Sequence, residues 1–249
     1  MKTREFTRAQ TIAVPATLGT VQVRAIAKAL TACADGPVGR QANSPVILRG
    51  GPQVFCNGLD LVPRKDDDAN DLEESVTEYV DLLLQIRCCA RTTIAVIEGA
   101  AAGGGLGIAA ACDVLWATPN ASFSLPEVHL GLAPNVIFPL LRQRVSAAHL
   151  RAMALDGLSR CPARMLAYGL LDEIIEAADL EPRLSALLRA MGRADPDAME
   201  AVRAGGREDA PMLREGMLAG ARRTAAMLKS PGVRRRMVAL QESGAPWML

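Results

Sequence analysis

Five glycines fall within residues 99–107, between an apolar run at Thr93–Ile97 and an apolar, alanine-rich stretch that ends near Cys112. The run has the composition of a buried strand, and the stretch after the glycines has that of a buried helix. Glycine allows close backbone approach, and the first turn of a helix presents unpaired amides and the positive end of its dipole. The sequence therefore predicts a strand, a glycine turn and a helix N-terminus suited to negative charge. Close packing of helix on strand is the alternative role for these glycines, and their spacing does not match the G-x-G-x-x-G dinucleotide fingerprint.

The same rhythm of strand, turn and helix extends along the first two thirds of the chain. Strands are expected at 45–51, 113–117 and 121–124, and apolar residues at helical spacing predict a helix over 76–90. Beyond about residue 180 the strand signals vanish. Helices are expected there at 181–193, 196–204, 211–229 and 231–243, with prolines at or near their starts. The pattern indicates an α/β core over residues 1–180 and a helical region over 181–249.

Composition excludes several classes of protein. Half of the 249 residues are hydrophobic but only 3% are aromatic, so the core must be aliphatic. The formal net charge of +1 gives no case for nucleic acid or an anionic membrane as a partner. The N-terminal residues have no apolar signal-peptide segment, and no apolar run reaches the length of a membrane span. The six cysteines form no C-x-x-C motif and are expected to be reduced, so we expect a cytoplasmic protein, and no cluster has metal-ligand spacing.

Two further stretches carry candidate chemistry. Phe55–Leu61 places Gly58 in a turn after a strand, where backbone amides can point inward, although an ordinary strand-end turn has the same pattern. Within Ala121–Pro134, Glu127 follows a proline among apolar residues. A carboxyl in such surroundings has a raised pKa and suits proton transfer, whereas a solvated or capping glutamate is the ordinary alternative.

Together these stretches closely resemble the crotonase (enoyl-CoA hydratase/isomerase) superfamily. The patterns F-x-x-G-x-D-L, G-x-A-x-G-G-G, A-C-D and F-x-x-P-E-V-x-L-G-L-x-P occur in the family's order and spacing. The resemblance covers residues 45–176. It implies an α/β fold built as a spiral of ββα units, with the C-terminal helices forming an oligomerisation region of a homotrimer or hexamer.

The resemblance also implies roles for individual residues. The amides of Asn57 and Gly104 would form an oxyanion hole for a thioester carbonyl, and Glu127 would be the catalytic base. The expected substrate-binding residues are Gly58, Leu59, Asp60, Gly103 and Asn135. No metal or other cofactor is expected, because the substrate is carried on coenzyme A or on the phosphopantetheine of an acyl carrier protein.

Two departures from the family pattern narrow the function. Hydratases of the family carry two glutamates, whereas Gly107 stands at the position of the first one here. The usual N-terminal R-P-x-x-x-N-A segment is replaced by Val14–Gly19. Simple hydration of a straight-chain enoyl thioester therefore becomes a poorer interpretation.

Residues 124–145 and Glu242–Trp247 are similar to the crotonase-type dehydratases of polyketide β-branching cassettes. The predicted reaction is dehydration of a 3-hydroxy-3-methylglutaryl thioester on an acyl carrier protein, with Asn135 orienting the leaving hydroxyl or capping its loop. Basic clusters at Arg142, Arg144, Arg222, Arg223 and Arg234–Arg236 either meet phosphopantetheine and carrier protein or are solvated helix faces. The alternatives are an enoyl-CoA isomerase or hydratase, a thioester decarboxylase, a non-catalytic thioester-binding subunit and a structural subunit.

Overall fold

The computed structural model describes residues 9–34, 44–60 and 69–243, with the side chains of 69–73 and 241–243 excepted. Five strands form one sheet in the order β1 (Gln10–Ala13), β2 (Val46–Arg49), β4 (Thr93–Ile97), β6 (Val114–Ala117) and β8 (Glu173–Ile174). Three more form a second sheet in the order β3 (Val54–Cys56), β5 (Ala100–Ala102) and β7 (Ser122–Ser124). All pairings between these strands are parallel.

The described helices are α1 (Thr20–Ala34), α2 (Ala69–Arg87), α3 (Gly104–Ala111), α4 (Phe138–Leu141), α5 (Ala147–Asp156), α6 (Pro162–Ala167), α7 (Leu180–Met191), α8 (Pro196–Gly205), α9 (Ala210–Leu228) and α10 (Pro231–Ser243). Two 3-10 helices, η1 (Pro126–Leu130) and η2 (Ala177–Asp179), complete the set. Three successive turns of the chain each add one strand to each sheet, in β2–β3, β4–β5 and β6–β7, and α2 and α3 follow the first two of these pairs. The predicted spiral of ββα units is confirmed.

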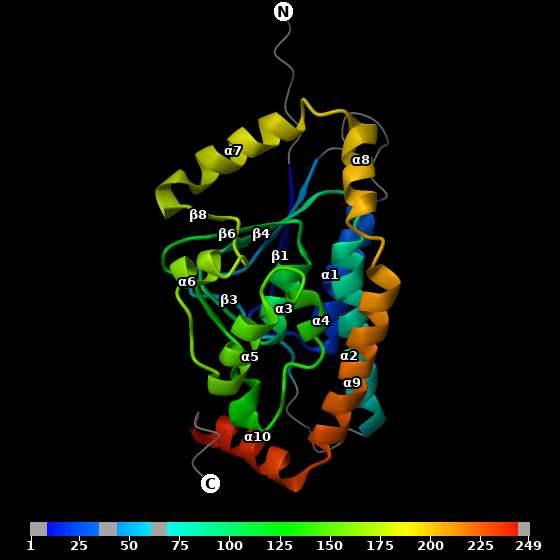
Figure 1. Ribbon diagram of the computed structural model, residues 1–249, viewed down its shortest axis with the longest axis vertical. Helices are drawn as coiled ribbons and strands as arrows, with labels where there is room; N and C mark the ends of the chain where they lie inside the picture. Colours follow the sequence, from blue (N-terminus) through cyan, green and yellow to red (C-terminus); the bar gives the residue numbers. More distant parts are fainter. Residues whose placement is uncertain (1–8, 35–43, 61–68, 244–249) are drawn as a thin grey trace, which may run out of the picture.

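The parallel arrangement explains why the strands are so apolar. A parallel sheet is covered on both faces, so its strands read as continuous hydrophobic runs. All five residues of β4 are buried, and Ile94 pairs with Ile47 on one side and with Val114 on the other. Helix α3 is buried over Gly105–Ala111, where it packs on β3 and β5 of the small sheet and on α2 and α4. Its N-terminus is thereby fixed at the centre of the molecule (Figure 1).

Asp113 joins two neighbouring strands where they begin. Its Oδ2 accepts hydrogen bonds from the amide and the hydroxyl of Thr93, at 2.8 and 3.0 Å, and its own amide donates to Thr93 Oγ1 at 3.0 Å. Asp113 therefore ties the start of β6 to the start of β4.

The four C-terminal helices lie within a few residues of their predicted bounds. Helix α7 lays Leu180 and Leu184 on the outer face of the large sheet, against Ile94 and Trp116. Helix α9 runs beside α2 and α4 (Figure 1). These contacts are all made within one chain. The role of the C-terminal helices in oligomerisation and the domain division at residue 180 therefore stay predictions. None of the described helices is long and apolar enough to span a bilayer.

Several elements were not predicted from the sequence, among them β1, α1, β3, β5 and β8. Helix α2 begins at Ala69, before the predicted start at residue 76. Leu61 of the F-x-x-G-x-D-L pattern and residues 244–247 of the C-terminal pattern lie outside the described residues.

Candidate active site

A pocket opens where the N-terminus of α3 meets α2, α9 and the segment that follows β7. It encloses about 640 Å³ of space free of protein atoms. Its wall is mainly apolar, and its lining consists of Asn57, Leu59, Val76, Tyr79, Gly103, Gly104, Pro126, Glu127, Leu130, Leu132, Ala133, Pro134, Asn135, Val136, Ile137 and Thr224. An apolar cleft with a few converging polar groups is the usual form of a small-molecule site.

Glu127 is the carboxyl group of this pocket and lies in η1, directly after Pro126. Burial raises its pKa to about 7, because an apolar surrounding disfavours the charged form. Its Oε2 is buried and has no hydrogen-bond partner among the described residues. Its Oε1 lies beside Gly103, where a Cβ would come within 2.9 Å of it. A buried carboxyl with one unpaired oxygen and a pKa near neutrality is suited to remove and return a proton.

Two glycine turns meet beside this carboxyl. Gly58 and Gly103 both have positive φ angles, 92° and 50°, which favour glycine. A Cβ on Gly58 would lie 2.6 Å from the amide nitrogen of Gly104, and a Cβ on Gly104 would lie 3.3 Å from the amide nitrogen of Leu59. Neither amide has a hydrogen-bond partner within the part of the chain that the structure describes. The amides of Leu59 and Gly104 are therefore adjacent and unpaired at the pocket wall.

The prediction that Asn57 supplies one oxyanion donor does not hold. The Asn57 amide donates to the carbonyl of Ala16 at 2.7 Å, so it is already used within the fold. The amide of Asp60 is likewise used, by Leu18 O at 2.9 Å. Residues 57 and 60 bond the segment before α1, and the intervening Leu59 is left with its amide free. Leu59, expected only among the substrate-binding residues, is thus the candidate donor in place of Asn57, and both residues line the pocket.

The other predicted residues fall as follows. Gly103, Gly104 and Asn135 line the pocket, whereas Asp60 is exposed and is not among the lining residues. The Asn135 side-chain amide contacts Met227 Sδ at 3.6 Å. Cys56 is buried under the Gly58 turn, and burial raises its pKa to about 11, so its thiol stays protonated near neutral pH. A buried, protonated thiol is a poor nucleophile.

A model of the enoyl-CoA hydratase/isomerase family matches residues 23–230, which is most of the chain. The chain belongs to this family. An enoyl-CoA hydratase of Alternaria alternata is 32% identical over 154 residues, which cover 61% of this chain and 51% of the relative. A mevalonyl-coenzyme A hydratase of Aspergillus fumigatus is 30% identical over 159 residues, 61% of this chain and 57% of the relative. The chain thus spans about half the length of these two curated relatives.

A solved structure described as a polyketide biosynthesis enoyl-CoA hydratase from Bacillus subtilis has the same fold. The two superpose with a TM-score of 0.79 at 21% identity, over 96% of each chain. At this identity the likeness establishes the crotonase fold.

In this member of the enoyl-CoA hydratase/isomerase family, Gly107 replaces the first glutamate of the hydratases, and the structure leaves no room for a side chain there. A Cβ on Gly107 would lie 2.3 Å from the Tyr79 hydroxyl and 2.6 Å from Ile137 Cγ2, so the place of a second glutamate is filled. The Tyr79 hydroxyl donates to the carbonyl of Gly104. Burial, and then the nearby Cys56 and Glu127, raise the Tyr79 pKa well above its ordinary value. Tyr79 was missed from the sequence, where it is one apolar-face residue of a helix.

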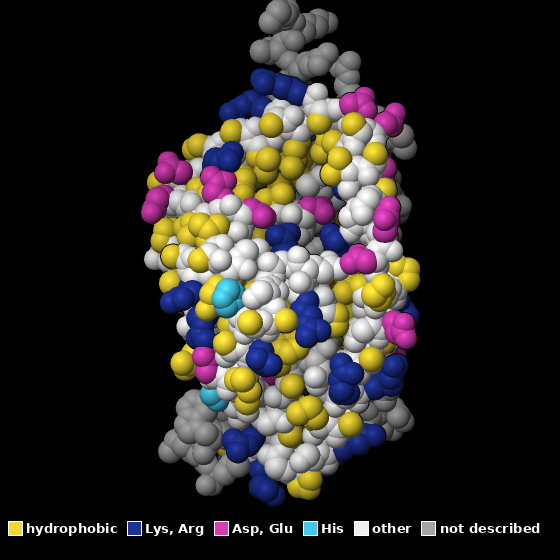
Figure 2. All heavy atoms as spheres, in the orientation of Figure 1, with side chains coloured by type: hydrophobic (Ala, Val, Ile, Leu, Met, Phe, Trp, Pro, Cys, Tyr) yellow, Lys and Arg dark blue, Asp and Glu magenta, His cyan; other side chains and the backbone are white. Residues whose placement is uncertain are grey.

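The predicted basic clusters divide into two kinds. Arg144 donates to the carbonyls of Cys112 and Asp113 at 2.7 and 2.8 Å, so it joins the end of α3 to β6 and is not free to meet a phosphate. The side chains of Arg142, Arg222, Arg223, Arg234 and Arg235 are exposed. Figure 2 shows Lys and Arg side chains gathered over the lower half of the visible face, around α9 and α10.

Proposed function

We propose that this protein dehydrates a branched 3-hydroxyacyl thioester, and that its substrate is a 3-hydroxy-3-methylglutaryl group on an acyl carrier protein. The observation that carries the proposal is one buried carboxyl, Glu127, with its pKa raised to about 7, in the same pocket as the free amides of Leu59 and Gly104. A base and an oxyanion site are the two groups that thioester enolate chemistry requires.

In this mechanism Glu127 removes the proton from the α-carbon. The electron pair moves into the thioester carbonyl, and its oxygen is stabilised by the amides of Leu59 and Gly104. The enolate then collapses, the α–β double bond forms, and the C3–O bond breaks. Glu127 returns its proton to the departing hydroxide, so one water leaves and the carboxylate is restored. The place of a second carboxylate is filled by Tyr79, so one group carries the proton in both steps.

The branched acyl group is supported by three observations. Residues 124–145 are similar to the β-branching dehydratases, one relative is a mevalonyl-coenzyme A hydratase, and one structural neighbour is described as a polyketide biosynthesis enzyme. Mevalonyl is itself a branched 3-hydroxyacyl group. A pocket wall of leucine, valine, isoleucine and proline accommodates such a branch.

The carrier is proposed to be a phosphopantetheine arm, whether on a carrier protein or in coenzyme A. The exposed arginines of α9 and α10 would meet its phosphate or an acidic carrier surface. We further propose a homotrimer or hexamer in the cytoplasm. Figure 2 shows apolar side chains gathered between α7 and α8, which would suit a subunit contact.

Two other functions use the same site. An enoyl isomerase also needs one base and an oxyanion hole, and a decarboxylase needs only the hole. A non-catalytic thioester-binding subunit would have no use for a buried, unpaired carboxyl, whose retention costs stability. Glu127 therefore favours an enzyme over a binding subunit.

Mass spectrometry of 3-hydroxy-3-methylglutaryl carrier protein, incubated with the pure protein, tests the proposal. Loss of one water supports dehydration. Loss of carbon dioxide would assign a decarboxylase, and an unchanged mass would contradict the proposed substrate. The Glu127→Gln variant is the control and should leave the mass unchanged.

A further inference from the structure

Thr224 is a buried hydroxyl group on the pocket wall, and it comes from α9, far along the chain from the catalytic motifs. Its side chain is 5% exposed, and its Oγ1 has no hydrogen-bond partner among the described residues. Glu127 Oε2 is the other unpaired buried oxygen that lines this pocket. Buried polar groups are nearly always paired, so an unpaired one that faces a cavity indicates a ligand.

A threonine inside a helix usually donates its hydroxyl to the carbonyl four residues earlier. Thr31 does so on α1, where Oγ1 lies 3.1 Å from Ala27 O. Thr224 makes no such bond to Gly220, although it lies in the interior of a regular helix. The hydroxyl of Thr224 is thus left for a group that enters the pocket.

A chain of packing contacts connects Thr224 to the oxyanion site and separates the two. One turn along α3 from the oxyanion amides, Gly107 packs against Ile137. Two residues before Ile137, the carbonyl of Asn135 packs on Gly220, where a Cβ would lie 2.2 Å from Asn135 O. Thr224 follows Gly220 by one turn of α9. The order of contacts leads from the thioester site, past Ile137 and Asn135, to Thr224.

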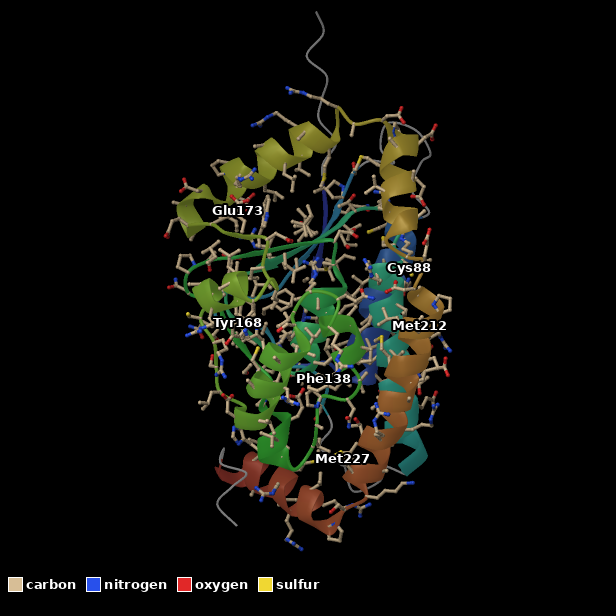
Figure 3. The ribbon with its side chains drawn as sticks, in the orientation of Figure 1. Cys88, Phe138, Tyr168, Glu173, Met212 and Met227 are labelled. Carbon is tan, nitrogen blue, oxygen red and sulfur yellow. The ribbon has the colours of Figure 1, made fainter. Side chains whose placement is uncertain are left out.

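The side chain of Asn135 faces the same helix. Its Nδ2 lies 3.6 Å from the thioether of Met227, which is labelled near the end of α9 in Figure 3. A thioether is a weak acceptor, so an oxygen of a bound ligand would replace it readily. Asn135 and Thr224 together offer two donors at one end of an otherwise apolar pocket.

We propose that Thr224 and Asn135 form a polar subsite that binds an oxygen at the far end of the acyl chain. The proposal rests on the proposed thioester function. It specifies how the end of the acyl chain away from the thioester is recognised. Both side chains donate, so the bound group is an acceptor, either a terminal carboxylate or a terminal hydroxyl. Among the described residues, no Lys, Arg or His lines the pocket, so the described donors at this end are neutral.

Binding of unreactive analogues tests the subsite without any turnover. Three coenzyme A thioesters share a branched five-carbon chain without the 3-hydroxyl: 3-methylglutaryl, 5-hydroxy-3-methylpentanoyl and 3-methylpentanoyl. Thr224→Val removes the hydroxyl at nearly constant shape. It should weaken binding of one or both oxygen-bearing analogues by about three- to tenfold, the usual worth of one hydrogen bond, and leave the 3-methylpentanoyl analogue unchanged. Titration calorimetry measures all three, and which analogue is weakened identifies the carboxylate or the hydroxyl.

Two controls separate this role from a structural one. Thr224→Ser keeps the hydroxyl and should restore the affinity, and Thr31→Val removes a helix hydroxyl far from the pocket and should leave the affinity unchanged. Thr224→Val should also unfold at no lower temperature than the unmodified protein, since the free protein gives that hydroxyl no partner. Equal weakening of all three analogues, or of none, would overturn the subsite. A protein that binds them as expected but dehydrates no thioester would retain the subsite and lose the proposed function.

Discussion

A methyl group on Gly58 would lie 2.6 Å from the backbone nitrogen of Gly104, so the two turns that carry the candidate oxyanion donors touch without any side chain between them. The distance between the donors therefore depends on this contact. Each turn comes from a different strand of the small sheet, so the separation is set by the parallel pairing of β3 with β5.

Gly58→Ala should disturb this contact. Alanine at a φ of 92° is strained, and its Cβ would push against Gly104 N. We expect kcat to fall about a hundredfold or more, the scale of losing one oxyanion donor, and stability to fall by at least about 1–2 kcal/mol. Gly205→Ala, where no atom lies within 4 Å of the new Cβ, is the matched control. Unchanged kcat in a folded Gly58→Ala protein would remove the donor role from this pair of turns.

The pH profile of the reaction should reflect Glu127. As a base it must be ionised, and burial raises its pKa to about 7. We expect kcat/KM to rise with pH and to level off above about pH 7, because this ratio follows ionisation of the free enzyme. Steady-state rates from pH 5 to 9 measure it. A profile already flat at pH 5 would mean that another group is the base.

The ionisation of Glu127 that activity requires should lower the stability of the folded protein. The folded-state pKa of about 7 lies above the ordinary value of 4.5, so between these values the folded protein holds a proton that the unfolded chain has lost. The contribution of Glu127 to stability therefore declines as pH rises from 4.5 to 7 and stays low above it, by on the order of 3 kcal/mol.

Glu127→Gln does not titrate and should lack this decline. Relative to the unmodified protein it should gain stability between pH 5 and pH 8, as measured by urea unfolding at each pH, while losing turnover. A variant that loses turnover and becomes less stable at pH 8 would indicate a structural carboxylate.

The space beside Gly107 gives a test by double mutation. Gly107→Ala should destabilise the protein, because its Cβ would meet the Tyr79 hydroxyl and Ile137. Tyr79→Phe removes the hydroxyl, so the cost of Gly107→Ala should be smaller in that background, with a coupling of about 0.5–3 kcal/mol for residues in contact. Additive costs within about 0.5 kcal/mol would show that the two residues do not compete for one space.

Arg144 gives a contrasting prediction. Its guanidinium bonds the carbonyls of Cys112 and Asp113 and lies 3.6 Å from the Asp172 carboxylate. Arg144→Met should cost about 1–3 kcal/mol of stability by leaving these carbonyls unpaired, with KM for the thioester unchanged. Arg222→Met, on the exposed side of α9, should leave stability unchanged. If KM for the thioester rose in Arg144→Met and not in Arg222→Met, Arg144 would be a substrate-binding residue after all.

The sequence predicted what is local and could not predict what depends on distant partners. Strand β4 and the C-terminal helices lie where glycine, proline and apolar periodicity placed them, because those signals act within a few residues. The turn at Gly58 was also found, but the choice between Asn57 and Leu59 was not. The free amide is decided by Ala16, which lies in a segment whose pairing has no local signal. Tyr79 and Thr224 were missed for a similar reason, since each reaches the pocket from a helix that reads as ordinary amphipathic sequence.

The wall that α9 gives to the pocket has a consequence for the order in which the site is completed during synthesis. The base and both candidate donors precede residue 130, whereas Thr224 and Met227 emerge from the ribosome almost a hundred residues later. A nascent chain that has released its two sheets would thus carry the reactive groups in a cleft open on one side. With the proposed subsite on α9, selectivity for the acyl group would arise only when α9 docks along α2.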